Sequence, residues 1–172
     1  HITENIIKLF ESFFDPKKKR STSNSNRIQR HIKLSLEKVQ ILDEDRILNR
    51  FKNLIEATLR TNFYQVDKRA NQKPYISFKF NSSQLIDLPL PRPMAEIFVY
   101  SPRMEGIHLR GGKVARGGIR WSDRREDFRT EILGLMKSQM PKNSVIVPVG
   151  AKGGFVVKRR PSHWGRNELQ RE

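Results

Sequence analysis

The chain has 172 residues and no cysteine, and its 34 lysines and arginines outnumber 18 acidic residues to give a formal net charge of +16. This length allows one ordinary domain with an appendage, and the lack of cysteine excludes disulfides, thiolate nucleophiles and cysteine-based zinc sites. No apolar run approaches the roughly 20 residues of a membrane-spanning helix, and no secretory signal opens the chain, which together predict a cytoplasmic protein without a membrane partner.

Helical periodicity dominates the first part of the chain. Apolar residues recur at helical spacing in residues 2–14, 28–39 and 47–59,. Between the first two segments, residues 17–26 (KKKRSTSNSN) carry no apolar side chain and predict a mobile basic loop,. We therefore expect residues 1–64 to form a helical linking module without chemistry of its own.

The third of these helices has the clearest signals. Asp43 to Asp45 offer side chains that can cap its N-terminus. An apolar stripe of this kind predicts a helix that buries one side. The stripe consists of Ile47, Phe51, Leu54, Ile55 and Leu59.

The hydrophobic pattern changes to alternation after Tyr64. Alternating apolar residues predict strands at 76–80 and near residues 97–99 and 107–109,. The stretch 88–93 (LPLPRP) cannot be regular sheet, because each of its three prolines lacks a backbone N–H,.

A helix and a short strand follow. Residues 123–140 predict a helix that Asp123 and Glu126 can cap as a pair, and the apolar run at 144–148 predicts a buried strand. The expected buried face of the helix consists of Phe128, Ile132, Leu135, Met136 and Met140. This order of elements predicts an α/β (α+β) fold, with residues 65–172 as part of a layered sheet-and-helix domain.

A glycine pair marks the first candidate site. Gly117 and Gly118 let the backbone approach a ligand closely, because neither carries a side chain. Arg116 and Arg120 flank the pair, and a guanidinium matches the geometry of a carboxylate. The alternative is a glycine turn between two strands with exposed arginines.

A lysine among small residues marks the second candidate site. Lys152 lies in the segment 149–154, which follows the predicted strand and is expected to be a loop. Apolar neighbours and nearby cations would lower the pKa of such a lysine, as proton transfer requires. Lys142, ten residues earlier, could point into the same cleft as Lys152. The alternative for Lys152 is an ordinary exposed loop lysine.

Other site classes find little support. The chain has no GxGxxG fingerprint, Walker A loop, GxSxG or HExxH motif,, and its four histidines are too scattered to predict a metal site. The charge of +16 raises a basic nucleic-acid-binding module as the alternative function. Aromatic residues do not alternate with the basic ones, as a stacking platform for bases would require, so we expect no specific nucleic-acid partner.

Three ordered blocks carry a family resemblance. The runs SPRMEGIHLR (101–110), KVARGGIRWSDRREDFRTEILGLMKSQM (113–140) and KNSVIVPVGAKGGF (142–155) resemble the large bacterial NAD-specific glutamate dehydrogenases. The likeness extends upstream through LDEDRILNRFKNLIEATLRTNFYQ to PLPRPMAEIFVYSPR, so it covers most of the chain.

The resemblance implies roles for individual residues. Lys152 holds the place of the catalytic lysine, which assists water addition and proton transfer between the 2-imino acid and 2-oxoglutarate. Lys142 is the best match to the lysine that binds the α-carboxylate of glutamate. Arg116, followed by Gly117 and Gly118, occupies the place of a basic residue that holds the side-chain carboxylate. Smaller members of the family usually carry lysine at the place of Arg116, and their glycine loop is one residue longer.

The resemblance also implies what lies elsewhere. The catalytic aspartate and the Rossmann domain of this family follow downstream, so we expect no cofactor-binding residue in this chain and NAD to be bound by a longer parent enzyme. The chain alone is then expected to be inactive. The parent is expected to act on L-glutamate and 2-oxoglutarate, as a homo-oligomer.

Overall fold

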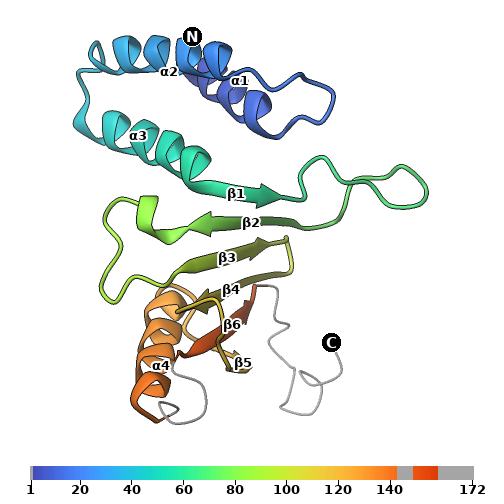
Figure 1. The fold of residues 1–172 in the computed structure, drawn as a ribbon, viewed down its shortest axis with the longest axis vertical. Helices are drawn as coiled ribbons and strands as arrows, with labels where there is room; N and C mark the ends of the chain where they lie inside the picture. Colours follow the sequence, from blue (N-terminus) through green and yellow to red (C-terminus); the bar gives the residue numbers. More distant parts are fainter. Residues whose placement is uncertain (1, 143–148, 159–172) are drawn as a thin grey trace.

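The computed structural model describes residues 2–142 and 149–158. Three helices, α1 (Ile2–Phe14), α2 (Thr22–Leu36) and α3 (Leu42–Ala57), lie together at one end of a six-stranded sheet (Figure 1). The sheet has the order β1-β2-β3-β4-β6-β5. Among the described residues, one further α-helix, α4 (Phe128–Lys142), packs against β4 and β6. The α+β fold class predicted from the sequence is confirmed.

The strands pair mostly with their neighbours in sequence. β1 (Thr58–Thr61), β2 (Ile76–Asn81), β3 (Ala95–Tyr100) and β4 (Met104–Arg110) form an antiparallel meander. β6 (Ala151–Val157) pairs antiparallel with β4 and parallel with β5 (Ile119–Trp121). The three strands predicted from alternation are confirmed as β2, β3 and β4.

The α1–α2 pair holds the core of the helical end. Ile6 and Leu9 of α1 pack against Ile32 and Leu36 of α2, and all four side chains are buried. The helix predicted at 2–14 is confirmed.

The predicted loop at 17–26 is too long, because α2 begins at Thr22. The Ser21 hydroxyl caps this helix by accepting from the Asn24 N–H at 3.3 Å. Ser25 is buried, and its hydroxyl lies 3.2 Å from that of Ser12. A stretch without apolar residues thus starts a helix here, because the Ser21 side chain satisfies one of the free N–H groups of the first turn,.

α3 is confirmed as a helix, but its predicted cap and face are wrong. Its N-cap residue is Ile41, which makes no side-chain hydrogen bond. The three acidic residues lie in the first turn, where their negative charges interact favourably with the positive end of the helix dipole. Within the predicted stripe, Ile55 packs against the α1–α2 core. Ile47, Phe51, Leu54 and Leu59 are 40% to 56% exposed.

The helical end joins the sheet through α3. Ala57 is buried with Phe80 of β2 and Leu85. The Asn53 amide donates to the Gln84 carbonyl at 2.8 Å and accepts from the Ile86 N–H at 2.9 Å, next to the 3₁₀ helix η1 (Ser82–Gln84). Because β1 begins at Thr58, the sheet starts inside the segment 1–64 that we assigned to the helical module; the division into two units stays a prediction.

Proline-rich residues 88–93 connect η1 to β3 without regular structure, as predicted, and the Leu90–Pro91 peptide bond is cis. Among the described residues, no helix is long and apolar enough to cross a membrane.

α4 begins five residues later than predicted. Asp123 and Glu126 precede it in a turn, so the predicted capping pair is wrong. The Ser122 hydroxyl accepts from the Arg124 N–H at 3.1 Å, and the Arg124 guanidinium binds the Asp127 carboxylate at 2.6 and 3.0 Å. These contacts stabilise a turn at the residues that we predicted to form the start of the helix.

The predicted buried face of α4 is confirmed for Phe128, Ile132 and Met136 and in part for Leu135. Phe128, Ile132 and Met136 are buried, Leu135 is partly buried, and the core that they form includes Ile107 and Leu109 of β4 and Val156 of β6. The side chain of Met140 and the predicted strand at 144–148 lie outside the described residues.

Candidate functional site

The segment Arg116–Gly118 runs beside the start of β6. The Arg116 N–H donates to the Val149 carbonyl at 3.3 Å, the Ala151 N–H to the Arg116 carbonyl at 3.0 Å, and the Gly153 N–H to the Gly118 carbonyl at 2.9 Å. These bonds extend the parallel β5–β6 pairing by one bridge, between Arg116 and Gly150. The two sequence segments that we singled out are therefore neighbours.

Lys152 lies in a strand, so the predicted loop at 149–154 is wrong from Ala151 onward. β6 runs between β4 and β5, and Lys152 stands opposite Leu109. Opposite residues of an antiparallel pair point to the same face, and Leu109 packs against α4. Lys152 therefore projects to the α4 side of the sheet from a backbone that is hydrogen-bonded on both edges.

Gly118 lies beside the Lys152 ammonium. A Cβ on Gly118 would lie 3.9 Å from Lys152 Nζ. Lys152 is half-buried and Gly118 is exposed, so the ammonium lies near the surface beside an open backbone. A ligand that reaches Gly118 reaches Lys152 as well.

Gly117 is required by packing. A Cβ at this position would overlap the carbonyl group of Ala151. Gly150 is restricted in a similar way, because its Cβ would lie 2.8 Å from the Met136 carbonyl oxygen of α4. Glycine at these positions lets the strand and the helix approach closely.

The other two predicted site residues are placed less completely. Arg116 is exposed, with its backbone in the bridge to Gly150. Lys142 is the last residue of α4, and its side chain lies outside the described residues. Among the described residues, no carboxylate lies within ion-pair distance of Arg116 or Lys152.

Gln139, which is not among the residues predicted from the sequence, also lies in this region. Its Oε1 atom is buried and has no hydrogen-bond partner among the described residues. The same atom would lie 3.1 Å from a Cβ on Gly117 and 3.6 Å from one on Gly150. Gln139 lies three residues before Lys142, which places both on one face of a helix; that spacing is the signal that would have found it.

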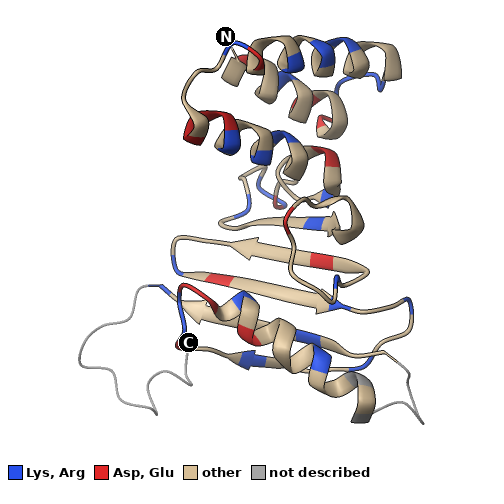
Figure 2. Cartoon of the chain, turned by 90° about the vertical axis from the view of Figure 1, so that its left-hand side faces the viewer, with Lys and Arg blue, Asp and Glu red and all other residues tan. Residues whose placement is uncertain are grey.

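Nearby charges differ in whether they are paired. Glu96, which is 5% exposed, accepts two hydrogen bonds from Arg129 of α4 at 2.6 and 2.9 Å. Basic residues are spread over the helical end and the sheet and do not form one stripe (Figure 2). Arg116 and Lys152 therefore differ from Arg129 in having no carboxylate partner among the described residues.

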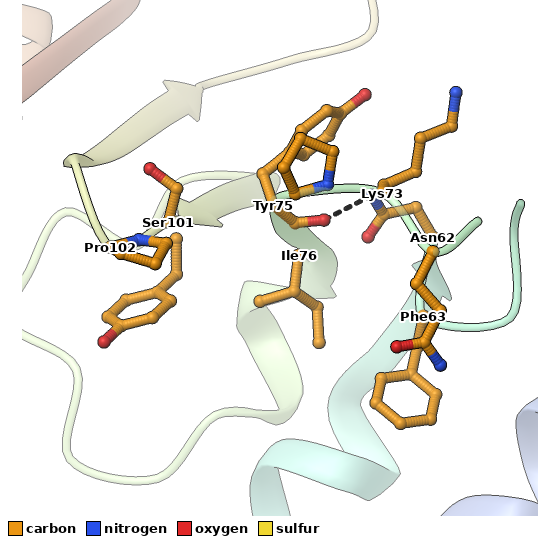
Figure 3. A pocket seen from close by; sticks show the side chains of 10 residues that line it. Asn62, Phe63, Lys73, Tyr75, Ile76, Ser101 and Pro102 are labelled. Carbon is orange, nitrogen blue, oxygen red and sulfur yellow. Dashed lines mark hydrogen bonds between the residues drawn. The ribbon is translucent and has the colours of Figure 1, made fainter. Parts of the chain in front are cut away.

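A separate hollow of about 210 Å³ lies between the turns at one end of β2 and β3 (Figure 3). Its walls include Phe63, Tyr75 and Tyr100, and none of the predicted site residues. The Asn62 side chain donates to the Tyr75 carbonyl at 3.0 Å and accepts from the Ser77 N–H at 2.7 Å. These two bonds hold the β1–β2 connection together.

The fold belongs to the α+β class, and comparison with known proteins gives its family. The family model described as bacterial NAD-glutamate dehydrogenase, catalytic domain, matches residues 31–172. The chain therefore belongs to the bacterial NAD-glutamate dehydrogenase family, and the resemblance noted in the sequence is confirmed. Among the described residues, no cluster of histidine and carboxylate side chains could hold a metal ion.

Curated relatives agree over nearly the whole chain. The chain is 55% identical to the NAD-specific glutamate dehydrogenase of Pseudomonas aeruginosa and 52% identical to that of Halomonas elongata, over 99% of its length in both cases. It is 51% identical, over 98% of its length, to the enzyme of that name from Mycobacterium tuberculosis. The matched segment is 10% to 11% of the length of these relatives.

Proposed function

We propose that the protein to which this chain belongs is an NAD-dependent glutamate dehydrogenase, which converts L-glutamate to 2-oxoglutarate and ammonia. This chain supplies the glutamate-binding side of the site, with Lys152 as the catalytic lysine. The observation that carries the proposal is the position of the Lys152 ammonium beside the open backbone of Gly118, without a carboxylate partner among the described residues.

The chemistry of glutamate suits this group of residues. Glutamate carries two carboxylates, and a site with one arginine and two lysines favours a dianion. In this proposal Arg116 holds the side-chain carboxylate and Lys142 the α-carboxylate. Gly118 keeps the approach free of a side chain, and Gly117 lets this segment lie against β6. Lys152 then assists the addition of water to the 2-imino acid and moves a proton.

NAD accepts the hydride when it is bound, and we assign its binding to polypeptide outside residues 1–172. A pyrophosphate site of the common kind needs a strand that leads through a glycine-rich turn into a helix. Where β5 leads into α4, residues 122–127 (SDRRED) contain no glycine. The chain alone is therefore expected to lack dehydrogenase activity. We place the parent enzyme in the cytoplasm as a homo-oligomer.

Replacing the catalytic lysine tests the proposal. In the full-length enzyme, Lys152→Ala should lower kcat by about 100-fold or more, because general acid–base catalysis contributes on this order. Lys137→Ala, which removes an exposed lysine of α4, is the matched control and should retain the parental rate. Turnover of Lys152→Ala within a few fold of the parent, with circular dichroism unchanged, would show the assignment to be wrong.

Lys142→Ala tests the second basic residue. It should chiefly raise KM for glutamate, because it removes a contact to the α-carboxylate and leaves the proton transfer in place. Saturation at the parental glutamate concentration would argue against this role.

The nucleic-acid alternative predicts binding to random DNA that persists above moderate salt.

A further inference from the structure

β5 is short for a strand that borders a site. It has three residues, all of them exposed, and its ladder partner in the sheet is β6. Parallel pairing is slightly less stable per residue than antiparallel pairing. Backbone hydrogen bonds alone give such a strand little resistance to local opening.

Glu131 of α4 ties this strand to the helix. The Ser122 hydroxyl, directly after β5, donates to Glu131 Oε2 at 2.6 Å, and Arg120 Nε of β5 lies 3.4 Å from Glu131 Oε1. Ser122 is 3% exposed, and the Glu131 side chain is 15% exposed. A carboxylate in this environment forms a stronger hydrogen bond than a neutral acceptor would.

Ser122 is fixed from the other side by the sheet. Its N–H donates to the Phe155 carbonyl of β6 at 2.8 Å. Glu131 is followed by Ile132, which packs where a Cβ on Gly154 would otherwise lie. One turn of α4 thus holds both β5, through Glu131, and β6, through Ile132.

We propose that Glu131 is a positioning residue of the lysine site: through Ser122 and Arg120 it holds β5 against β6 and so fixes the Gly118 backbone beside the Lys152 ammonium. This inference rests on the proposed function for its kinetic consequence. The structural consequence, that Glu131 restrains residues 116–122, is independent of it.

Kinetics of the full-length enzyme give the first test. Glu131→Ala should lower kcat/KM for glutamate roughly ten- to hundredfold, mainly through KM, because small misplacements of a site have effects of this order. Glu131→Gln keeps an acceptor for Ser122 and should recover part of the loss. A purely structural role would instead reduce the amount of active enzyme at unchanged KM.

Amide exchange gives the second test, and it does not depend on turnover. Glu131→Gln and Ser122→Ala should raise the hydrogen-exchange rate of the peptide covering 116–122 at least several-fold, while α1 and α2 exchange as in the parent. These milder variants serve if Glu131→Ala fails to fold. Glu105→Gln is the matched control, because Glu105 forms an ion pair with Lys158 at 2.9 Å near the other end of β6; its KM and the exchange of 116–122 should stay parental.

The possible failures are distinguishable. Parental KM in Glu131→Ala with an inactive Lys152→Ala would overturn the positioning role and leave the proposed function standing. An active Lys152→Ala with faster exchange at 116–122 in Glu131→Gln would overturn the proposed function and keep the structural part of this inference. Unchanged exchange in both milder variants would refute the inference altogether.

Discussion

The two ends of the molecule reach their packing in different ways. At the helical end, α1 and α2 bury a core of ordinary aliphatic side chains, while α3 leaves Phe51 56% exposed. At the other end, α4 lies so close to the chain that Gly154 of β6, and Gly150 just before this strand, have no room for a side chain. Close approach of a helix to a strand therefore accompanies the candidate site, whereas the helices at the other end pack through side chains.

The largest difference should appear when a side chain is truncated. Met136 of α4 is fully buried, so Met136→Ala should lower the free energy of unfolding by about 2–5 kcal/mol, as expected when a core side chain is lost. Phe51→Ala at the helical end should change it by no more than about 0.5 kcal/mol, because the ring is exposed. Urea titration measures both, and a large loss for Phe51→Ala would mean that the face of α3 is packed.

Adding a methyl group sharpens the comparison. A Cβ on Gly154 would lie 2.6 Å from Ile132 Cγ1, so Gly154→Ala should cost about 1–3 kcal/mol of stability through overpacking. Gly134 of α4 is the matched control, since its Cβ would meet nothing within 4 Å. Gly134→Ala should stabilise the protein by about 0.5–1 kcal/mol through helix propensity. Equal effects of the two substitutions would contradict the close approach of α4 to β6.

The smallest effect concerns pH. Burial, with a smaller contribution from Arg110, lowers the pKa of His108 below its ordinary value of 6.5. The unfolded chain then binds the proton first, so the free energy of unfolding should fall as pH drops below about 6.5,. His108→Gln should flatten this dependence between pH 7.5 and about 5.5. The exposed His31 of α2 provides the control His31→Gln, and an equal flattening by both would rule out the effect of burial.

The order of elements was predictable because apolar spacing reports burial directly. Residues 76–80 alternate and form a strand, and Phe128, Ile132 and Met136 recur at helical spacing and form one buried face. The start of α2 was missed because Ser21 acts through a backbone hydrogen bond and leaves no apolar signal. The apolar stripe of α3 is exposed, but its spacing in the sequence is the same as that of a buried stripe, so the sequence could not distinguish the two.

The candidate site was predictable in its residues and less so in its local structure. Gly153 and Gly154 suggest a loop, since glycine is common in turns. In the fold they lie in β6, where Ile119 and Ile132 occupy the space of their missing side chains. Sequence alone cannot distinguish a glycine that permits a turn from one that lets a neighbouring side chain pack against the backbone. Gln139 was missed because its buried amide oxygen belongs to no recognised motif.

The place of β6 in the sheet constrains the order in which the strands can assemble during synthesis. β1 to β4 form a meander of consecutive strands, whereas β6, the last strand in sequence among the described residues, lies between β4 and β5. β5 has no other strand to pair with in the described sheet, so it cannot join before β6 does. During synthesis the meander can therefore assemble first, and the strand that carries Lys152 joins it later, with β5. A ribosome that stops before residue 151 would release a chain that has the meander β1–β4 and lacks the lysine site.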